Sequence, residues 1–407
     1  MTSTASIDRM DGYAGKRSIG LFTIFRCTNY GAVLQAIALK RTLARLFPDA
    51  AVEVINHWMD PRDTHLLGKV TNPHTPWFQR WLNRRKFARR YLRPDLFEAR
   101  RARTIALIGH ELAPSAYVAR SPDELRNLPS YDVVVVGSDQ VWNPGLNHDF
   151  HVNPYLCTTF PEGQRRVAYA ASFGVGELPA ACEADCRSAL GRFAAITVRE
   201  ETGAAICERL IVRKPAVALD PTLLMTANEW RAALGEPSTL PQPSTLNAQP
   251  ITAYWVRRVT QADVDALARF VRQTGAGKLM LLSAGPMPKL AIPPEVEVCI
   301  DAGPFDFVRH IAASSGVITD SFHGLQFAVT FRKPVLALGQ LGDPASNVSR
   351  LVDFGRRYGI GDAVHDIDGF RTGGERTFAD PSRIDGAALE RDRAHSMECL
   401  RNMVGPG

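Results

Sequence analysis

The chain of 407 residues lacks a long apolar run. No stretch reaches the ~20 predominantly apolar residues that a membrane-spanning helix needs, so the sequence predicts no transmembrane segment. Residues 1–15 are small and polar and have no apolar core of the kind that a secretory signal peptide contains. We therefore expect a cytoplasmic protein.

Cysteine is scarce and scattered. The chain has seven cysteines, an odd number, at Cys27, Cys157, Cys182, Cys186, Cys207, Cys299 and Cys399. Cys182 and Cys186 lie four residues apart, but no second pair matches them at a zinc-ligand spacing. The sequence therefore predicts reduced, buried thiols, with neither a disulfide framework nor a metal site.

The net charge of +6 is largely local. Residues 80–103 hold ten Arg and Lys residues against two acidic residues, Asp95 and Glu98. A basic block of this kind can attract nucleic acid, a membrane surface or an anionic substrate. We expect no nucleic-acid binding, because no aromatic-interleaved strand or recognition module accompanies the charge.

Aromatic residues share this basic segment. Trp77 and Trp81 lie four residues apart, and further steps of three and four residues lead from Trp81 through positions 84 and 88 to Tyr91. This spacing predicts a helix with an aromatic stripe and an Arg-rich opposite side. Two interpretations are open. In the one we favour, the helix packs its aromatic residues inward and solvates its arginines. In the other, residues 77–103 make a peripheral membrane contact or approach a lipid-diphosphate acceptor.

Short apolar runs alternate with amphipathic stretches along most of the chain. Val133–Val136, a run of four valines bounded by Asp132 and Gly137, is typical of a buried parallel strand. Further strands are expected at residues 18–25, 52–56, 167–171, 195–198, 251–256, 278–282, 296–300, 316–319 and 334–338. Strands that alternate with helices are typical of the α/β class.

Two domains are expected at this length, because single cores stop growing at about 250–300 residues. The sequence predicts two doubly wound, Rossmann-like α/β domains over residues 17–212 and 220–380, which face a central cleft. A segment rich in Pro, Ser and Thr at 234–249 is predicted to be a flexible surface loop. Residues 383–403 are predicted to form a terminal helix that can cross back onto the first domain.

The hexapeptide Thr319–Gly324 is the most informative single feature. It follows an apolar run and precedes an amphipathic stretch, which predicts a strand, a turn and a helix capped by Ser321. A helix N-terminus attracts anions, and His323 in its first turn could donate a proton near neutral pH. A small phosphorylated or carboxylated substrate is therefore expected. The alternative is that His323 caps the helix or fills the core.

Polar, small-residue turns follow several of the predicted strands. Examples are residues 137–139, 172–174 and 199–201. Ligands in open α/β sheets bind outside the carboxyl ends of the strands, so the turns of two facing domains would line one cleft.

Seven short segments stand out when they are read together. They are Cys27–Gln35, Gly137–Pro144, Tyr169–Gly174, Val198–Glu200, Leu219–Leu224, Thr319–Gly324 and Asn347–Arg350. In their order and their amino-acid sequences they resemble the polysaccharide pyruvyl transferase family, over about residues 18–360. The resemblance implies a fold like that of the two-domain GT-B glycosyltransferases. It also implies transfer of the enolpyruvyl unit of phosphoenolpyruvate (PEP) to two hydroxyls of a sugar, with release of phosphate and with no cofactor beyond this donor.

The resemblance associates the donor site with His323 and Arg199. The residues expected to bind PEP are Arg199, Ser321, His323, Gly324 and Arg350, with Ser349 as a further candidate. The residues expected to catalyse transfer are His323 as acid or phosphate clamp and Asp139, then Glu200, as base. The residues expected to line the acceptor side are Asn29, Tyr30, Gly31, Gln35, Ser138, Trp142 and Ser172.

Several of these residues have a purely structural alternative. Arg199 could form an interdomain salt bridge, Asp139 could cap a helix, and packing is the favoured role of Trp142. The acceptor could be lipid-linked, nucleotide-linked or polymeric. Two other functions also stay open: a GT-B glycosyltransferase that uses a nucleotide sugar, and a binding protein without turnover.

Overall fold

The computed structural model describes residues 15–57, 76–145, 153–236, 250–341, 348–374 and 376–405. Most of the loop predicted at 234–249, the residue Asn347 and nearly all of the polar segment 1–15 lie outside these ranges.

The first domain is built on a six-stranded sheet whose strands are all parallel. The strand order is β2 (Ala51–Val54), β1 (Ser18–Phe22), β5 (Val133–Val136), β6 (Arg166–Ala171), β7 (Ala195–Val198) and β8 (Ala216–Val217). The four valines of β5 are fully buried, as expected for a strand covered on both faces. A separate two-stranded sheet pairs β3 (Asn56–His57) with β4 (Val118–Ala119).

The second domain repeats this design with six more parallel strands. Their order is β11 (Val296–Val298), β10 (Leu279–Ser283), β9 (Ile251–Trp255), β12 (Val317–Thr319), β13 (Val335–Gly339) and β14 (Val364–Asp366). In both sheets the strand order reverses beside the first strand, between β1 and β5 and between β9 and β12. Such switch points are where doubly wound sheets bind ligands. The predicted α/β class with two doubly wound sheets is confirmed.

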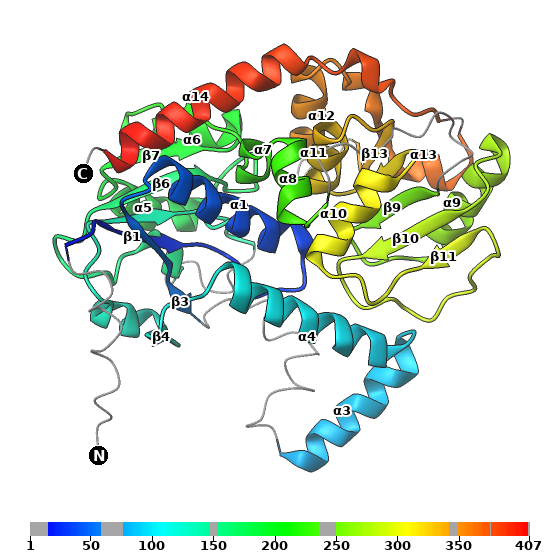
Figure 1. Ribbon diagram of the computed structural model, residues 1–407, viewed down its shortest axis with the longest axis horizontal. Helices are drawn as coiled ribbons and strands as arrows, with labels where there is room; N and C mark the ends of the chain where they lie inside the picture. Colours follow the sequence, from blue (N-terminus) through cyan, green and yellow to red (C-terminus); the bar gives the residue numbers. More distant parts are fainter. Residues whose placement is uncertain are drawn as a thin grey trace.

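Helices flank both sheets (Figure 1). In the first half they are α1 (Tyr30–Leu46), α3 (Trp77–Arg90), α4 (Pro94–Glu111), α5 (Ala180–Leu190), α6 (Glu201–Ile211), α7 (Pro221–Leu224) and α8 (Ala227–Ala233). In the second half they are α9 (Gln261–Thr274), α10 (Pro304–Ala313), α11 (Phe322–Thr330), α12 (Val348–Arg357), α13 (Ile367–Arg371) and α14 (Gly386–Val404).

Helix α14 returns from the second domain to the first and runs along both (Figure 1). Its last turns bury Leu400 and Val404 in the core of the first domain. The hydroxyl of Ser396 accepts a hydrogen bond from the backbone N–H of Leu219, at 2.9 Å. The helix therefore ties the two domains together, because it begins in the core of the second domain, with Leu389, and ends in the core of the first.

Helix α1 makes a second connection between the domains. Tyr30, its first residue, stacks on Tyr254 and Phe307 of the second domain, with ring centres 5.2 Å apart in both pairs. Its hydroxyl donates to the carbonyl of Ala302 at 2.9 Å. Because Tyr30 is fully buried, the start of α1 is fixed against the second domain.

Helix α4 reinforces this contact through one buried arginine. The guanidinium of Arg100 donates to the carbonyl of Ser283 at 2.7 Å and to that of Thr28, just before α1, at 2.8 Å. The junction between the domains is therefore held by both apolar and polar contacts.

Candidate active site

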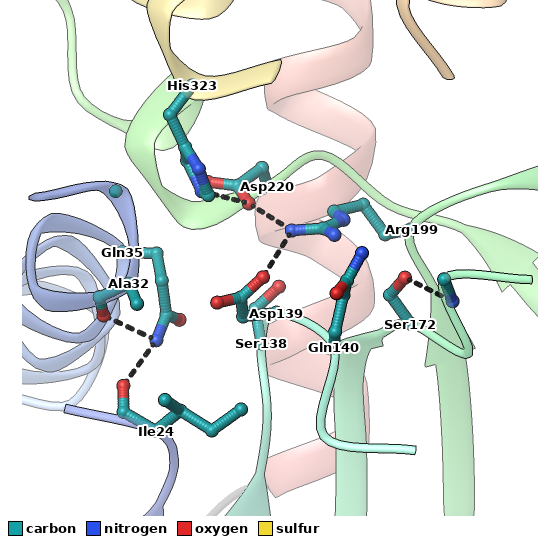
Figure 2. Close-up of polar contacts among 12 residues, drawn as sticks. Ile24, Ala32, Gln35, Ser138, Asp139, Gln140, Ser172, Arg199, Asp220 and His323 are labelled. Carbon is teal, nitrogen blue, oxygen red and sulfur yellow. Dashed lines mark hydrogen bonds and ion pairs between the residues drawn. The ribbon is translucent and has the colours of Figure 1, made fainter. Parts of the chain in front are cut away.

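The candidate site lies at the junction of the domains, where turns after several strands meet two helix starts. Asp139 follows β5, Ser172 follows β6 and Arg199 follows β7. Asp220 precedes α7, and His323 lies in the first turn of α11, beyond β12. Figure 2 shows the side chains of Asp139, Arg199, Asp220 and His323 pointing toward one another.

Arg199 is at the centre of the cluster, with a side chain only 2% exposed. Its Nη1 donates to Asp139 Oδ1 at 3.2 Å and to Asp220 Oδ2 at 3.0 Å. Its Nε lies 3.6 Å from Glu200 Oε2. Burial lowers the pKa of the guanidinium, but the surrounding carboxylates, led by Asp139, outweigh burial and raise the pKa above its usual range. Arg199 is therefore a permanent buried cation.

Asp220 links Arg199 to His323. Its Oδ2 accepts from Arg199 and lies 3.3 Å from His323 Nε2, while its Oδ1 accepts from the backbone N–H of Thr222 and so caps α7 (Figure 2). Burial raises the pKa of this carboxyl, yet the close contact with His323, together with Arg199, holds the pKa well below its usual range. Asp220 was not among the predicted site residues. The sequence feature that could have drawn attention to it is the helix-cap pattern Asp-Pro-Thr within Leu219–Leu224.

His323 is held in place by the start of α11. Ser321 caps this helix, as the sequence predicts, by accepting from the N–H of Gly324 at 3.2 Å. A side chain at Gly324 would overlap Thr319, so only glycine fits there. On its other side the imidazole lies directly against Gly31 of α1. The ring therefore occupies the contact between the two domains, where a change in domain spacing would move it.

Replacement of Gly31 with alanine is expected to displace His323, because the added Cβ would overlap the imidazole ring. Overpacking of this kind typically costs about 1–3 kcal/mol, and the ring would lose its position beside Asp220. We expect at least a tenfold loss of turnover and a lower melting temperature. The matched control is Gly109→Ala in α4, where a Cβ would have no neighbour within 4 Å. Equal behaviour of the two variants would contradict the prediction.

A second arginine approaches the cluster from α12. The guanidinium carbon of Arg350 lies 5.5 Å from the centre of the Phe322 ring, and that of Arg199 lies 5.3 Å from the same ring. With the Gln140 amide oxygen turned toward Arg350, that oxygen accepts from Nη1 at 3.0 Å and from Nη2 at 2.8 Å. Burial, and then the charge of Arg199, lower the pKa of Arg350 to about 10. Gln140 and Phe322 were not among the predicted site residues.

Four buried nitrogen atoms of this cluster have no hydrogen-bond partner among the residues that the structure describes. They are Nη2 of Arg199 and Nε of Arg350, together with Arg199 Nε and His323 Nε2, which each lie within ion-pair distance of a carboxylate. A buried donor without a partner costs about 1–3 kcal/mol, so such groups are uncommon unless a ligand or water satisfies them. Glu200 Oε2 is also without a hydrogen bond there, while its Oε1 accepts from Ser172 at 2.6 Å. The arrangement is suited to holding an anion between the two guanidinium groups.

The remaining predicted residues occupy packed positions. Asn29 caps α1, and Ser138 donates to the carbonyl of Ala170 at 2.7 Å. The Gln35 amide donates to Ile24 and Ala32 carbonyls, each at 3.0 Å (Figure 2), and Trp142 is buried with its Nε1 bonded to the Tyr155 carbonyl. These side chains, like Tyr30, build the walls around the cluster. Their contact with a ligand stays a prediction, and Ser349 is placed only as a backbone position at the start of α12.

Two doubly wound domains with polar residues of both at their junction define the GT-B class of fold. The chain is similar to S. aureus MnaA in a co-structure with UDP, at 12% identity and a TM-score of 0.50 over 95% of this chain and 97% of that one. It is equally similar to a proposed UDP-N-acetylglucosamine 2-epimerase from Listeria monocytogenes, at 13% identity and a TM-score of 0.50 over 97% and 99% of the two chains. Identities this low show the fold alone, and they confirm the predicted GT-B-like architecture.

Residues 29–340 match the sequence model of polysaccharide pyruvyl transferases. The matched range contains the start of α1, the turns that follow β5 and β12, and every side chain of the cluster except Arg350. The chain therefore belongs to the polysaccharide pyruvyl transferase family of enzymes, as its motifs predict. No curated protein sequence shows a significant match to it.

Proposed function

We propose that this enzyme transfers the enolpyruvyl unit of PEP to two hydroxyls of a sugar in a bacterial polysaccharide or glycan precursor. One observation supports the proposal above the others. Arg199 and His323, the two residues that the family motifs associate with the donor, lie against the same oxygen of Asp220. Beside them are buried guanidinium donors that have no hydrogen-bond acceptor in the described part of the chain.

PEP carries a phosphate and a carboxylate, and both need cationic or N–H donors. Arg199 Nη2 and Arg350 Nε are the donors that remain available within the described cluster. The N-terminus of α11 adds backbone N–H groups and a positive dipole end. We assign the phosphate to this helix start and to Arg350, and the carboxylate to Arg199.

The balance of charge in the cluster affects how an anionic donor could bind. Two guanidinium groups, of Arg199 and Arg350, face the carboxylates of Asp139, Glu200 and Asp220. A neutral His323 leaves the cluster with an excess of negative charge, which opposes binding of an anionic donor. An imidazolium at His323 removes that excess. In the proposed mechanism the ring acts in its protonated form, because only the imidazolium can donate a proton.

In the proposed reaction His323 delivers its proton to C3 of PEP, which becomes a methyl group. The first sugar hydroxyl forms a bond to C2 and loses its proton to a carboxylate, Asp139 in first place and Glu200 in second. The second hydroxyl then forms the other bond to C2, the C2–O bond to phosphate breaks, and phosphate leaves with the remaining proton. General acid–base help of this kind typically contributes about 10²–10⁴-fold.

Phosphorus NMR of the purified protein with PEP and a panel of sugar acceptors tests this function. We expect inorganic phosphate to appear only when one acceptor class is present, together with a pyruvate ketal in the product. The rival function, a glycosyltransferase, draws on the fold similarity to the UDP-bound S. aureus protein. Release of nucleotide from a sugar nucleotide, with PEP left intact, would establish that rival.

Replacement of Arg350 with methionine is expected to weaken donor binding more than the chemical step. Methionine keeps much of the apolar stem but removes the charge and the free Nε donor. A hydrogen bond to a charged group contributes about 1.5–3 kcal/mol, so KM for PEP should rise about 10- to 100-fold. Steady-state kinetics against PEP measures this split. The control is Arg356→Met, an exposed arginine of the same helix. An unchanged KM in the Arg350 variant would remove Arg350 from the donor site.

A further inference from the structure

Helix α3 stands out from the body of the molecule beside α4 (Figure 1). Its first half exposes three large aromatic side chains, Trp77 (74%), Phe78 (56%) and Trp81 (47%). The expectation that this helix packs its aromatic stripe inward is therefore wrong for these residues. Clustered aromatic exposure of this size is unusual on a protein surface and marks an interaction site.

The other end of α3 is fixed. Phe87 is buried and packs on Tyr91, with ring centres 4.5 Å apart. Just past the helix, the N–H of Leu92 donates to the carbonyl of Met287 at 2.7 Å, and the N–H of Lys289 donates to that of Arg90 at 3.1 Å. These contacts anchor the C-terminal end of α3 to the second domain. The exposed aromatic residues therefore lie at the free end of a helix whose other end is fixed to the second domain.

Cations extend the exposed aromatic face along the helix. Arg85 lies one turn beyond Trp81, and its guanidinium carbon is 4.4 Å from the centre of the indole ring. Lys86, Arg89 and Arg90 are exposed in the following turn. Arg84 has a carboxylate 3.9 Å away, that of Glu98 on α4. The face therefore combines indole rings at its tip with a strongly positive flank.

We propose that α3 docks onto the surface of a bilayer that contains anionic phospholipids. Tryptophan favours the level of the lipid headgroups, where its apolar ring and N–H are both satisfied. Arginine and lysine beside it are attracted to anionic headgroups. This combination is typical of helices that lie on a membrane without crossing it. Among the residues that the structure describes, no helix is long and apolar enough to span a bilayer.

Flotation with vesicles tests the proposal. We expect the protein to float with vesicles of phosphatidylcholine and phosphatidylglycerol, to stay behind with pure phosphatidylcholine, and to be released by high salt. Arg85→Gln with Arg89→Gln should weaken binding about 25-fold, at roughly fivefold for each cation removed. Trp77→Ser with Trp81→Ser should reduce it at least as much. Matched controls are Arg126→Gln and Val212→Ser, which alter an exposed arginine and an exposed apolar residue elsewhere.

Three results would overturn the proposal. The first is no binding to phosphatidylglycerol vesicles, and the second is equal binding by the α3 variants and the controls. The third is a dimer in light scattering that the double Trp variant abolishes, since a second copy of the chain would then cover this face. The proposal is independent of the chemistry of the site, because α3 takes no part in the polar cluster. Phosphate release with a water-soluble acceptor should be the same in all these variants.

Discussion

Replacement of His323 with alanine is expected to abolish phosphate release from PEP while the chain stays folded. The imidazole is the one group of the described cluster that can both hold an anion and donate a proton near neutral pH. Loss of an acid of this kind typically costs about 10²–10⁴-fold in rate. The side chain packs in the contact between the domains and is not part of either hydrophobic core, so its removal should leave both sheets intact. Phosphorus NMR and thermal melting measure the two effects together.

The controls separate chemistry from structure. His323→Gln keeps a side chain beside Asp220 but cannot act as an acid, so it should melt closer to the wild type and remain inactive. His110→Ala alters an exposed histidine of α4 and should change neither quantity. A folded His323→Ala protein that releases phosphate at the normal rate would show that this histidine is not the acid. The donor assignment to Arg199 and Arg350 would then need separate support from binding measurements.

The sheets were largely predictable because parallel strands that are buried on both faces have short, continuous apolar runs in their sequence. Val133–Val136 and Val317–Thr319 are examples, and each is followed by a polar turn that the structure places at a switch point. Since ligand sites of such sheets lie at those points, the sequence also located Asp139, Arg199 and His323 correctly relative to their strands. Their chemical roles follow from the family and stay predictions.

Other parts of the site could not be predicted from one sequence. Asp220 reads as an ordinary helix cap, and only the folded chain shows that its second oxygen meets Arg199 and His323, from two distant segments. In α3 the helix was predicted, but the side that it packs against the protein was not. Helical spacing predicts that Trp77 and Trp81 share a stripe, but spacing does not say which stripe of a helix faces the protein. Phe87, on another side of the helix, makes the contact instead.

Replacement of Asp220 with alanine is expected to be strongly destabilising at neutral pH. The change leaves a buried guanidinium and an imidazole without a shared carboxylate and removes the cap of α7. Breaking a buried ion pair from one side costs about 3–5 kcal/mol, and the value should fall near the lower end because Arg199 keeps Asp139 and Glu200. Urea unfolding at pH 7 measures the difference, with the exposed Asp353→Ala of α12 as control.

The pH dependence of this difference identifies its cause. The pKa of Asp220 is lowered on folding, so its charge stabilises the protein above the pKa of the unfolded chain, about 3.9, and the benefit is lost as the pH falls toward the folded value. The gap in stability between wild type and Asp220→Ala should therefore be largest near neutrality and shrink below about pH 4. Asp220→Asn keeps the cap but not the charge, and should lie between the two. If the gap were constant from neutral to acid pH, the role of Asp220 would be that of a helix cap alone. The ionic contacts of Asp220 with Arg199 and His323 would then contribute nothing to the stability of the fold.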